Sequence, residues 1–176
     1  MKLLKELRNF DLNPSEVGSR IKYMKSLPID WDVYLPSIGM NLQRDFVWDL
    51  NQKQELIYSI LIGRHIPHLA IINTVHRANM KDDIYQIIDG KQRLSAIFNF
   101  IGGLFKIELD GALYSFSELP EEYQIAINHF HVRYYVINEP YDTPITDKEK
   151  INWFRYINFA GTPQDKQHLQ KITTIK

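Results

Sequence analysis

The chain contains no cysteine among its 176 residues. Disulfide bonds, a cysteine nucleophile and a thiolate metal site are therefore excluded within this sequence, and a reducing compartment fits. The N-terminal residues 1–6 lack the apolar core of a signal peptide, and no run approaches the roughly eighteen apolar residues of a membrane span. We expect a soluble cytoplasmic protein that does not act on a membrane.

An excess of charge of either sign is also missing, because 21 basic residues balance 21 acidic residues. The whole chain exerts no net electrostatic pull on nucleic acid, so DNA binding would need a local basic patch. The Walker phosphate loop, the Gly-x-Ser-x-Gly elbow and the His-Glu-x-x-His helix are absent. The histidines at 65/68 and 129/131 form close pairs, but neither pair has a third ligand at helpful spacing.

What is present is the composition of an ordinary globular domain, with 44% hydrophobic and 24% charged residues. Residues 1–30 predict a polar helical lead-in, in which Asn13 or Ser15 caps a helix that runs to about Leu27. A mixed α/β domain with a mixed sheet is predicted over residues 31–165, followed by a tail over residues 166–176.

Hydrophobic periodicity and turn residues predict the elements of this domain. Strands are expected at 31–35, 69–74, 84–88, 104–109, 113–116 and 131–138, with a turn at 80–83 and a hairpin turn at Asp110-Gly111. Helices are expected at 52–63, from the turn after residue 88 to Gly102, from Pro120, and from the capping-box pattern Thr146–Glu149 to about Asn158.

The most informative segment is Ile87-Ile88-Asp89-Gly90-Lys91-Gln92-Arg93-Leu94, where an apolar strand turns into a helix. A glycine at such a junction lets another group approach the backbone closely. The free N–H groups and the positive dipole end of the new helix favour an anion, typically a phosphate. Lys91 and Arg93 oppose the helix dipole, which suggests that an anion compensates them. A well-capped helix start with two cations on a solvated surface is the alternative, and both interpretations stay open.

Two further segments carry polar residues among aromatic ones. In Gln43-Arg44-Asp45-Phe46-Val47-Trp48 the two rings are expected to hold the loop on the core, while Gln43 and Arg44 could contact a ligand. Arginine suits phosphate because its planar fork binds oxygens in pairs. In Phe154–Pro163 a helix ends at Asn158 and turns at Gly161, which by itself favours an ordinary C-terminal cap.

Taken in order, the three segments resemble one family, domain of unknown function 262, which is the GmrS-type branch of the ParB/sulfiredoxin-like superfamily. Its hallmark is an Asp-Gly-Gln-Gln-Arg motif, and the resemblance covers roughly residues 30–165. The resemblance implies a ParB/sulfiredoxin-like nucleotide-binding domain with flanking helices, which binds and hydrolyses nucleoside triphosphates. Such domains commonly form the regulatory or motor half of modification-dependent restriction enzymes and other anti-phage systems.

The resemblance is carried over residue by residue. The matching residues are Gln43 and Arg44 of a Gln-Arg pair, Asp89, Gly90, Gln92 and Arg93 of the hallmark, and the late asparagine Asn158. Lys91 replaces the first glutamine of the hallmark and adds positive charge. Complete nucleases of the family carry a C-terminal His-Asn-His domain, which this sequence lacks, so we expect it not to cut DNA by that chemistry unaided. Sulfiredoxin chemistry needs a cysteine, and residues 164–176 are too short for the helix-turn-helix of a ParB protein.

The predicted function is therefore that of a stand-alone domain that binds a nucleoside triphosphate with Mg²⁺, hydrolyses it weakly and works with a protein partner such as a nuclease subunit. In this hypothesis Gly90 and the N–H groups of residues 91–93 hold the terminal phosphates, and Asp89 holds Mg²⁺. Asp89 and Arg93 are the candidate catalytic residues. The candidate nucleotide-binding residues are Gln43, Arg44, Gly90, Lys91, Gln92, Arg93 and Asn158.

The alternative is a non-enzymatic module, either a ParB-like protein that contacts DNA or an inhibitor that binds a protein partner in phage–host conflict. The sequence leaves open which nucleotide is preferred and which oligomer forms, a homodimer being one alternative.

Overall fold

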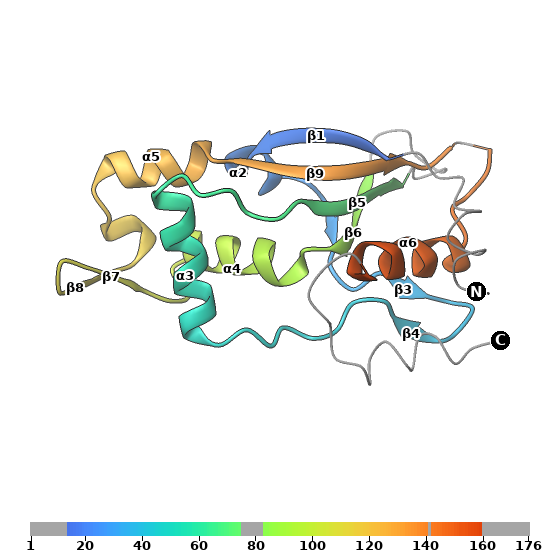
Figure 1. The fold of residues 1–176 in the computed structure, drawn as a ribbon, viewed down its shortest axis with the longest axis horizontal. Helices are drawn as coiled ribbons and strands as arrows, with labels where there is room; N and C mark the ends of the chain where they lie inside the picture. The colour runs from blue at the N-terminus through green and yellow to red at the C-terminus, as the bar shows by residue number, and fades with distance from the viewer. Residues whose placement is uncertain (1–13, 75–82, 141, 160–176) are drawn as a thin grey trace.

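The computed structural model describes residues 14–74, 83–140 and 142–159, and a five-stranded sheet lies at its centre (Figure 1). The strand order is β1-β9-β5-β6-β2. The strands are β1 (Ser15–Arg20), β2 (Ile29–Asp30), β5 (Leu69–Thr74), β6 (Ile84–Asp89) and β9 (His131–Asn138). The β1–β9 and β5–β6 pairs are antiparallel, whereas β5–β9 and β2–β6 are parallel. The predicted mixed α/β fold with a mixed sheet is thus confirmed.

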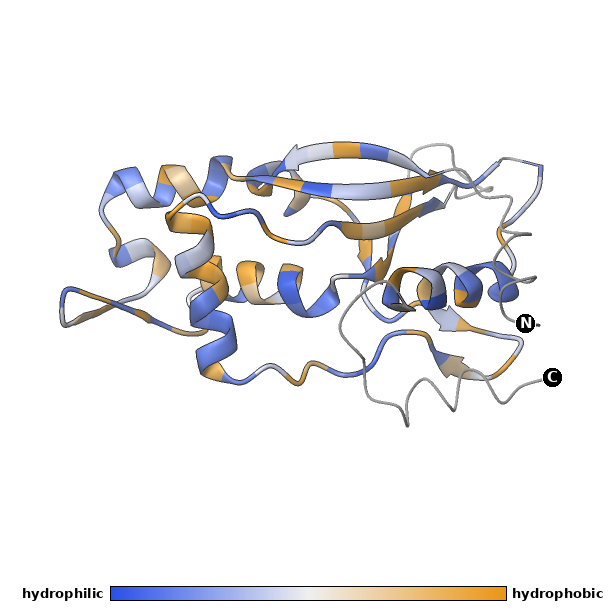
Figure 2. Cartoon of the chain, viewed as in Figure 1, coloured by the Kyte–Doolittle hydropathy of each residue, from blue (hydrophilic) through white to orange (hydrophobic). Residues whose placement is uncertain are grey.

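Successive side chains of a strand point to opposite faces, and the central strands have consecutive apolar residues, so the sheet buries both of its faces. Ile71 and Ile87 point into one core and Ile72 and Ile88 into another. The first core is closed by α2 (Ile21–Met24), α3 (Leu50–Leu61), α4 (Lys91–Ile101) and α5 (Glu121–His129). The second is closed by α6 (Asp147–Phe159) and the hairpin of β3 (Tyr34–Leu35) and β4 (Met40–Asn41). Figure 2 shows the hydrophobic colour gathered on β5, β6 and the inward sides of α3 and α4.

A second hairpin extends away from the sheet at the α3 and α5 end of the molecule (Figure 1). It consists of β7 (Ile107–Leu109) and β8 (Ala112–Tyr114), followed by the 3-10 turn η1 (Phe116–Glu118). Asp110 and Gly111 both have positive φ, at 50° and 80°, as a two-residue hairpin turn of type I′ requires. The predicted hairpin turn is confirmed, although its first strand begins at residue 107 rather than 104.

Capping residues set the starts of two helices. The Asp49 side chain accepts from the Gln52 N–H at 2.9 Å, and the Gln52 side chain accepts from the Asp49 N–H at 3.0 Å. This capping box starts α3 at Leu50, two residues before the predicted start. The predicted capping box at Thr146 and Glu149 is confirmed, since the Thr146 N–H donates to the Glu149 carboxylate at 2.8 Å.

The helix predicted from Asn13 or Ser15 to Leu27 is wrong over most of its described length. Residues Ser15–Arg20 form the edge strand β1, and only Ile21–Met24 are helical. Pairing with β9 supplies the backbone hydrogen bonds of this polar segment, and that partner lies far away in the sequence. Residues 15–30 therefore contribute two strands of the central sheet.

The strand predicted at residues 31–35 is also interrupted. The Asp30 carboxylate accepts from the N–H groups of Asp32 and Val33 at 3.2 and 3.0 Å and turns the chain there, with Val33 at φ 52°. Only Tyr34–Leu35 are extended. The predictions for residues 80–82, Gly161–Pro163 and the tail lie outside the described residues.

Candidate functional site

The site begins at the turn between β6 and α4, where Gly90 is the N-cap of α4 with φ 100°. This left-handed conformation favours glycine because other residues strain their Cβ there. A Cβ atom on Gly90 would overlap the Leu69 Cδ2 atom and lie 3.2 Å from Leu69 Cγ. The predicted close approach to the glycine is thus made by the side chain at the start of β5.

The first turn of α4 offers backbone N–H groups. Its first helical hydrogen bond runs from the Leu94 N–H to the Gly90 carbonyl oxygen at 3.0 Å, and no side chain caps the helix. The N–H groups of residues 91–93 are therefore outside the hydrogen bonds of the helix, and they lie at its positive dipole end.

Both cations of this turn are paired with carboxylates. Lys91 Nζ lies 2.6 Å from Asp32 Oδ1, and Arg93 Nη2 lies 2.6 Å from Asp89 Oδ2. The side chains of Lys91, Arg93 and Asp89 are 11%, 15% and 18% exposed, so these charges are largely removed from water. The compensation that the sequence assigned to a bound anion is supplied by two acids of the chain itself.

The loop of residues 43–48 lies against this turn and is held by two glutamines. Gln43 Nε2 donates to the carbonyl oxygens of Ile87 and Ile88 at 2.9 and 2.6 Å. Gln92 Oε1 accepts from the N–H groups of Val47 and Trp48 at 2.9 and 3.3 Å, and its Nε2 donates to the Asp45 carbonyl at 3.0 Å. Both predicted ligand-binding glutamines thus contact protein backbone.

Arg44 lies between these two attachment points. It is partly buried, and it makes no hydrogen bond or ion pair with the described residues. The aromatic rings of the loop have the expected role, because Phe46 and Trp48 pack against the core. Lys53 lies over the Phe46 ring at 4.8 Å from its centroid.

Asn158 lies near the C-terminal end of α6, a helix that packs against β6 (Figure 1). Its Nδ2 donates to the Phe154 carbonyl of the same helix at 2.7 Å. The structure thus brings the first two motifs into direct contact, while the amide nitrogen of Asn158 is used within α6.

Sequence reasoning missed Asp32 and His68. Asp32 lies two residues beyond the end of β2, and the pattern Asp30-x-Asp32 at the end of this short strand was a usable signal. The His68 carbonyl lies 3.4 Å from Arg93 Nη2, but a backbone contact of this kind leaves no trace in the sequence.

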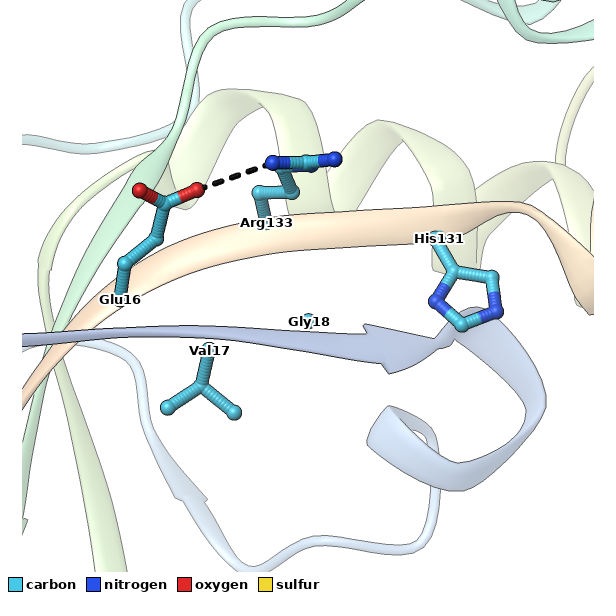
Figure 3. Close-up of a pocket in the computed structure, with 5 residues that line it drawn as sticks. All are labelled: Glu16, Val17, Gly18, His131 and Arg133. Carbon is cyan, nitrogen blue, oxygen red and sulfur yellow. Dashed lines mark hydrogen bonds and ion pairs between the residues drawn. The ribbon is translucent and has the colours of Figure 1, made fainter.

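A separate hollow of about 450 Å³ lies on the β1–β9 edge of the sheet, lined by Glu16, Val17, Gly18, His131 and Arg133 (Figure 3). Arg133 Nη1 lies 3.1 Å from Glu16 Oε1, and His68 Nε2 lies 3.2 Å from the same oxygen. Hydrogen bonds from His68 and then Arg133 lower the pKa of Glu16. None of the motif residues lines this hollow.

No group of three or more histidine and acidic residues suited to a metal occurs among the described residues. Within the same residues, no helix is long and apolar enough to cross a membrane.

The fold and the turn together define a mixed α/β domain in which a glycine-capped, cation-bearing helix start is covered by an arginine-bearing loop. A sequence family model matches residues 35–175, and it is that of the N-terminal domain of the GmrSD restriction endonuclease. Because this match spans most of the chain, the protein belongs to the GmrSD restriction endonuclease N-terminal domain family. It is thus related to a component of a restriction system. Neither the curated proteins nor the solved structures contain a match to the chain.

Proposed function

We propose that this domain binds a nucleoside triphosphate with Mg²⁺ at the β6–α4 turn and hydrolyses it slowly, as the regulatory part of a restriction system whose nuclease activity resides in a partner. The observation that carries this proposal is that the loop bearing Arg44 is hydrogen-bonded to the helix start at which the N–H groups of residues 91–93 lie outside the hydrogen bonds of the helix. Oriented N–H groups and a planar guanidinium are the donors that phosphate oxygens prefer.

The two ion pairs support binding through an exchange of partners. In the structure Arg93 neutralises Asp89 and Lys91 neutralises Asp32. When a metal–phosphate ligand binds, Asp89 would turn to the cation while Arg93 and Lys91 turn to the phosphates. Asp89, Arg93 and Lys91 each keep an opposite neighbour, and Asp32, whose side chain is 57% exposed, is left to water, so little uncompensated charge is created in the partly buried part of the site.

The residues present fit Mg²⁺, which binds proteins through one or two carboxylates and keeps the rest of its shell for water and phosphate oxygens. Asp89 Oδ2 contacts Arg93, and Asp89 is the acid of the hallmark motif. When bound, Mg²⁺ would supply neutralisation of phosphate charge. Arg93 and Arg44 would add positive charge as the bond to the leaving phosphate breaks. We also propose that the fold is related to that of the ParB/sulfiredoxin-like proteins.

Thermal-shift screening against ATP, GTP, CTP and UTP with Mg²⁺ tests binding directly. A ligand at ten times its dissociation constant stabilises a protein by roughly 1.4 kcal/mol, which such a screen detects. Arg44→Ala is the informative variant, because no described residue depends on Arg44 for a hydrogen bond. If no nucleotide shifts the wild-type melting temperature at millimolar concentration, the proposal fails.

Phosphate release tests the catalytic step. Arg93→Ala should lower the turnover rate by at least tenfold if its charge assists bond cleavage. Equal phosphate release by the wild type and this variant would remove Arg93 from the catalytic role while leaving nucleotide binding intact.

The carboxylate partners of Lys91 and Arg93 favour a second candidate, a non-enzymatic module that binds DNA or a protein partner. In that case the cations serve the fold and no nucleotide is needed for charge balance. This candidate predicts no turnover. DNA binding through phosphates would weaken steeply with salt, whereas a salt-independent affinity would argue for a protein partner.

A further inference from the structure

Resting on the proposed nucleotide site, we infer that Gln43 and Gln92 are positioning residues that present Arg44 to the phosphates, and that neither glutamine contacts the ligand. The two amides attach opposite ends of the 43–48 loop to the β6–α4 turn. In place of the expectation that both glutamines bind nucleotide, the two glutamines hold the loop and Arg44 contacts the ligand.

The hydrogen bonds of Gln92 carry the first part of this inference. Its Oε1 accepts two backbone N–H groups, from Val47 and Trp48, and its Nε2 donates to the Asp45 carbonyl. An amide oxygen has two acceptor sites, so the Gln92 oxygen is fully used by the loop. A ligand could donate a hydrogen bond to the Gln92 oxygen only by displacing the loop, and the Gln92 Nε2 that holds the Asp45 carbonyl is kept beside the loop by the same contacts.

Gln43 attaches the first residue of the loop to β6. Its Nε2 donates its two hydrogens to the carbonyl oxygens of Ile87 and Ile88, which directly precede Asp89, the last residue of β6. The loop is thus fixed to the strand before the turn and to the helix after it. Arg44 follows Gln43 directly, so its backbone position is set by the same attachment.

The consequence for Arg44 is preorganisation. Of the three cations in the first two motifs, Arg44 is the one whose guanidinium or ammonium group makes no ion pair within the described residues. A side chain on an unattached loop would lose conformational entropy on binding, which lowers affinity. Holding the loop before the ligand arrives removes part of that cost, so the effect of each glutamine on binding must pass through Arg44.

Amide hydrogen exchange of the ligand-free protein tests the attachment. Gln92→Met keeps the side-chain length and removes all three hydrogen bonds, so exchange at Val47 and Trp48 should accelerate roughly five- to tenfold, as the loss of one net hydrogen bond predicts. Gln92→Glu keeps an acceptor and should preserve much of the protection. Unchanged exchange in Gln92→Met would overturn the inference.

A double-mutant cycle with inorganic tripolyphosphate and Mg²⁺ tests the coupling to Arg44. Gln92→Met and Arg44→Ala should each weaken binding roughly tenfold, and together little more than Arg44→Ala alone. Gln43→Met provides a second cycle from the other end of the loop, should Gln92→Met fold poorly. Additive losses in a folded pair would overturn the inference but leave the nucleotide site standing.

The matched control is Gln124→Met, because the Gln124 side chain also donates to a backbone carbonyl, that of Leu119 at 2.8 Å, but far from the motifs on α5. It should change neither loop exchange nor tripolyphosphate affinity. If wild-type protein binds no tripolyphosphate, the proposed function fails and the presentation of Arg44 to phosphates fails with it, whatever the exchange data show.

Discussion

Gly90 and Leu69 lie so close together that a single added methyl group at Gly90 would overlap the Leu69 Cδ2 atom. Leu69 is 1% exposed and belongs to the core, so it cannot move outward to make room. The turn that starts α4 is therefore fitted to the first residue of β5, and the position of the candidate site depends on that fit.

The first prediction follows from this contact. Gly90→Ala should lower the free energy of unfolding by about 2–4 kcal/mol, because it combines a left-handed backbone with core overpacking. Gly103→Ala is the matched control, since Gly103 also has positive φ but nothing lies within 4 Å of its added Cβ. It should cost only about 1–2 kcal/mol. Urea unfolding measures both values, and equal losses would show that the contact with Leu69 does not matter.

The Asp89–Arg93 pair leads to a second prediction. Arg93→Met should destabilise the fold by about 1–3 kcal/mol, because it leaves a carboxylate of 18% exposure without its partner. Adding Asp89→Asn should recover part of this loss. The exposed Lys106–Glu118 pair provides the comparison, and Lys106→Met should cost less than about 1 kcal/mol. A double variant no more stable than Arg93→Met would contradict this account.

The Lys91–Asp32 pair gives a prediction about affinity. Asp32→Asn removes the negative charge next to Lys91 and should strengthen nucleotide binding roughly two- to fivefold, since a pair whose carboxylate is 57% exposed is worth up to about 1 kcal/mol. The gain should shrink as salt is added. Glu122→Gln makes the same charge change on exposed α5 and should leave affinity unaltered. Weaker binding by Asp32→Asn would place Asp32 among the residues that the site needs.

The pH dependence of stability provides a fourth prediction, at the 3-10 turn η1. Hydrogen bonds from the Ser115 N–H, then Lys106 and the Ser115 hydroxyl, lower the pKa of Glu118 from 4.5 to about 2. A depressed carboxyl pKa stabilises the fold above the unfolded value and loses this effect as pH falls through the folded value. Glu118→Gln should therefore be less stable than wild type at neutral pH, and the difference should narrow between pH 4.5 and about 2. A difference that stays constant over this range would refute the prediction.

Local signals made much of the fold predictable. β5 and β9 have the predicted bounds, 69–74 and 131–138, because apolar residues run continuously or alternate there. The strand–turn–helix of the hallmark motif was predictable for the same reason, with Gly90 at the junction. The start of α3 could have been found from its capping box, since Asp49 and Gln52 have the required spacing.

Contacts between distant segments were beyond the sequence. Gln92 and Val47 are 45 residues apart, and nothing in either segment indicates that one amide holds the other's backbone. The same holds for Lys91 and Asp32, which are 59 residues apart. The Asp32 carboxylate compensates the positive charge of Lys91, a role that the sequence analysis had given to a bound anion. β1 was missed because a polar edge strand takes its conformation from its neighbour β9.

The placement of β1 and β2 at the two opposite edges of the sheet has a consequence for folding kinetics. Both edge strands come from residues 15–30, whereas the three strands between them come from residues 69–138. Glu16 and Arg133, which bridge β1 and β9, are 117 residues apart in the chain. Contacts of such long range require costly loop closure and slow the search for the native state. β1 can pair only after β9 has been synthesised, so the strand that comes first in the described sequence is among the last to find its partner.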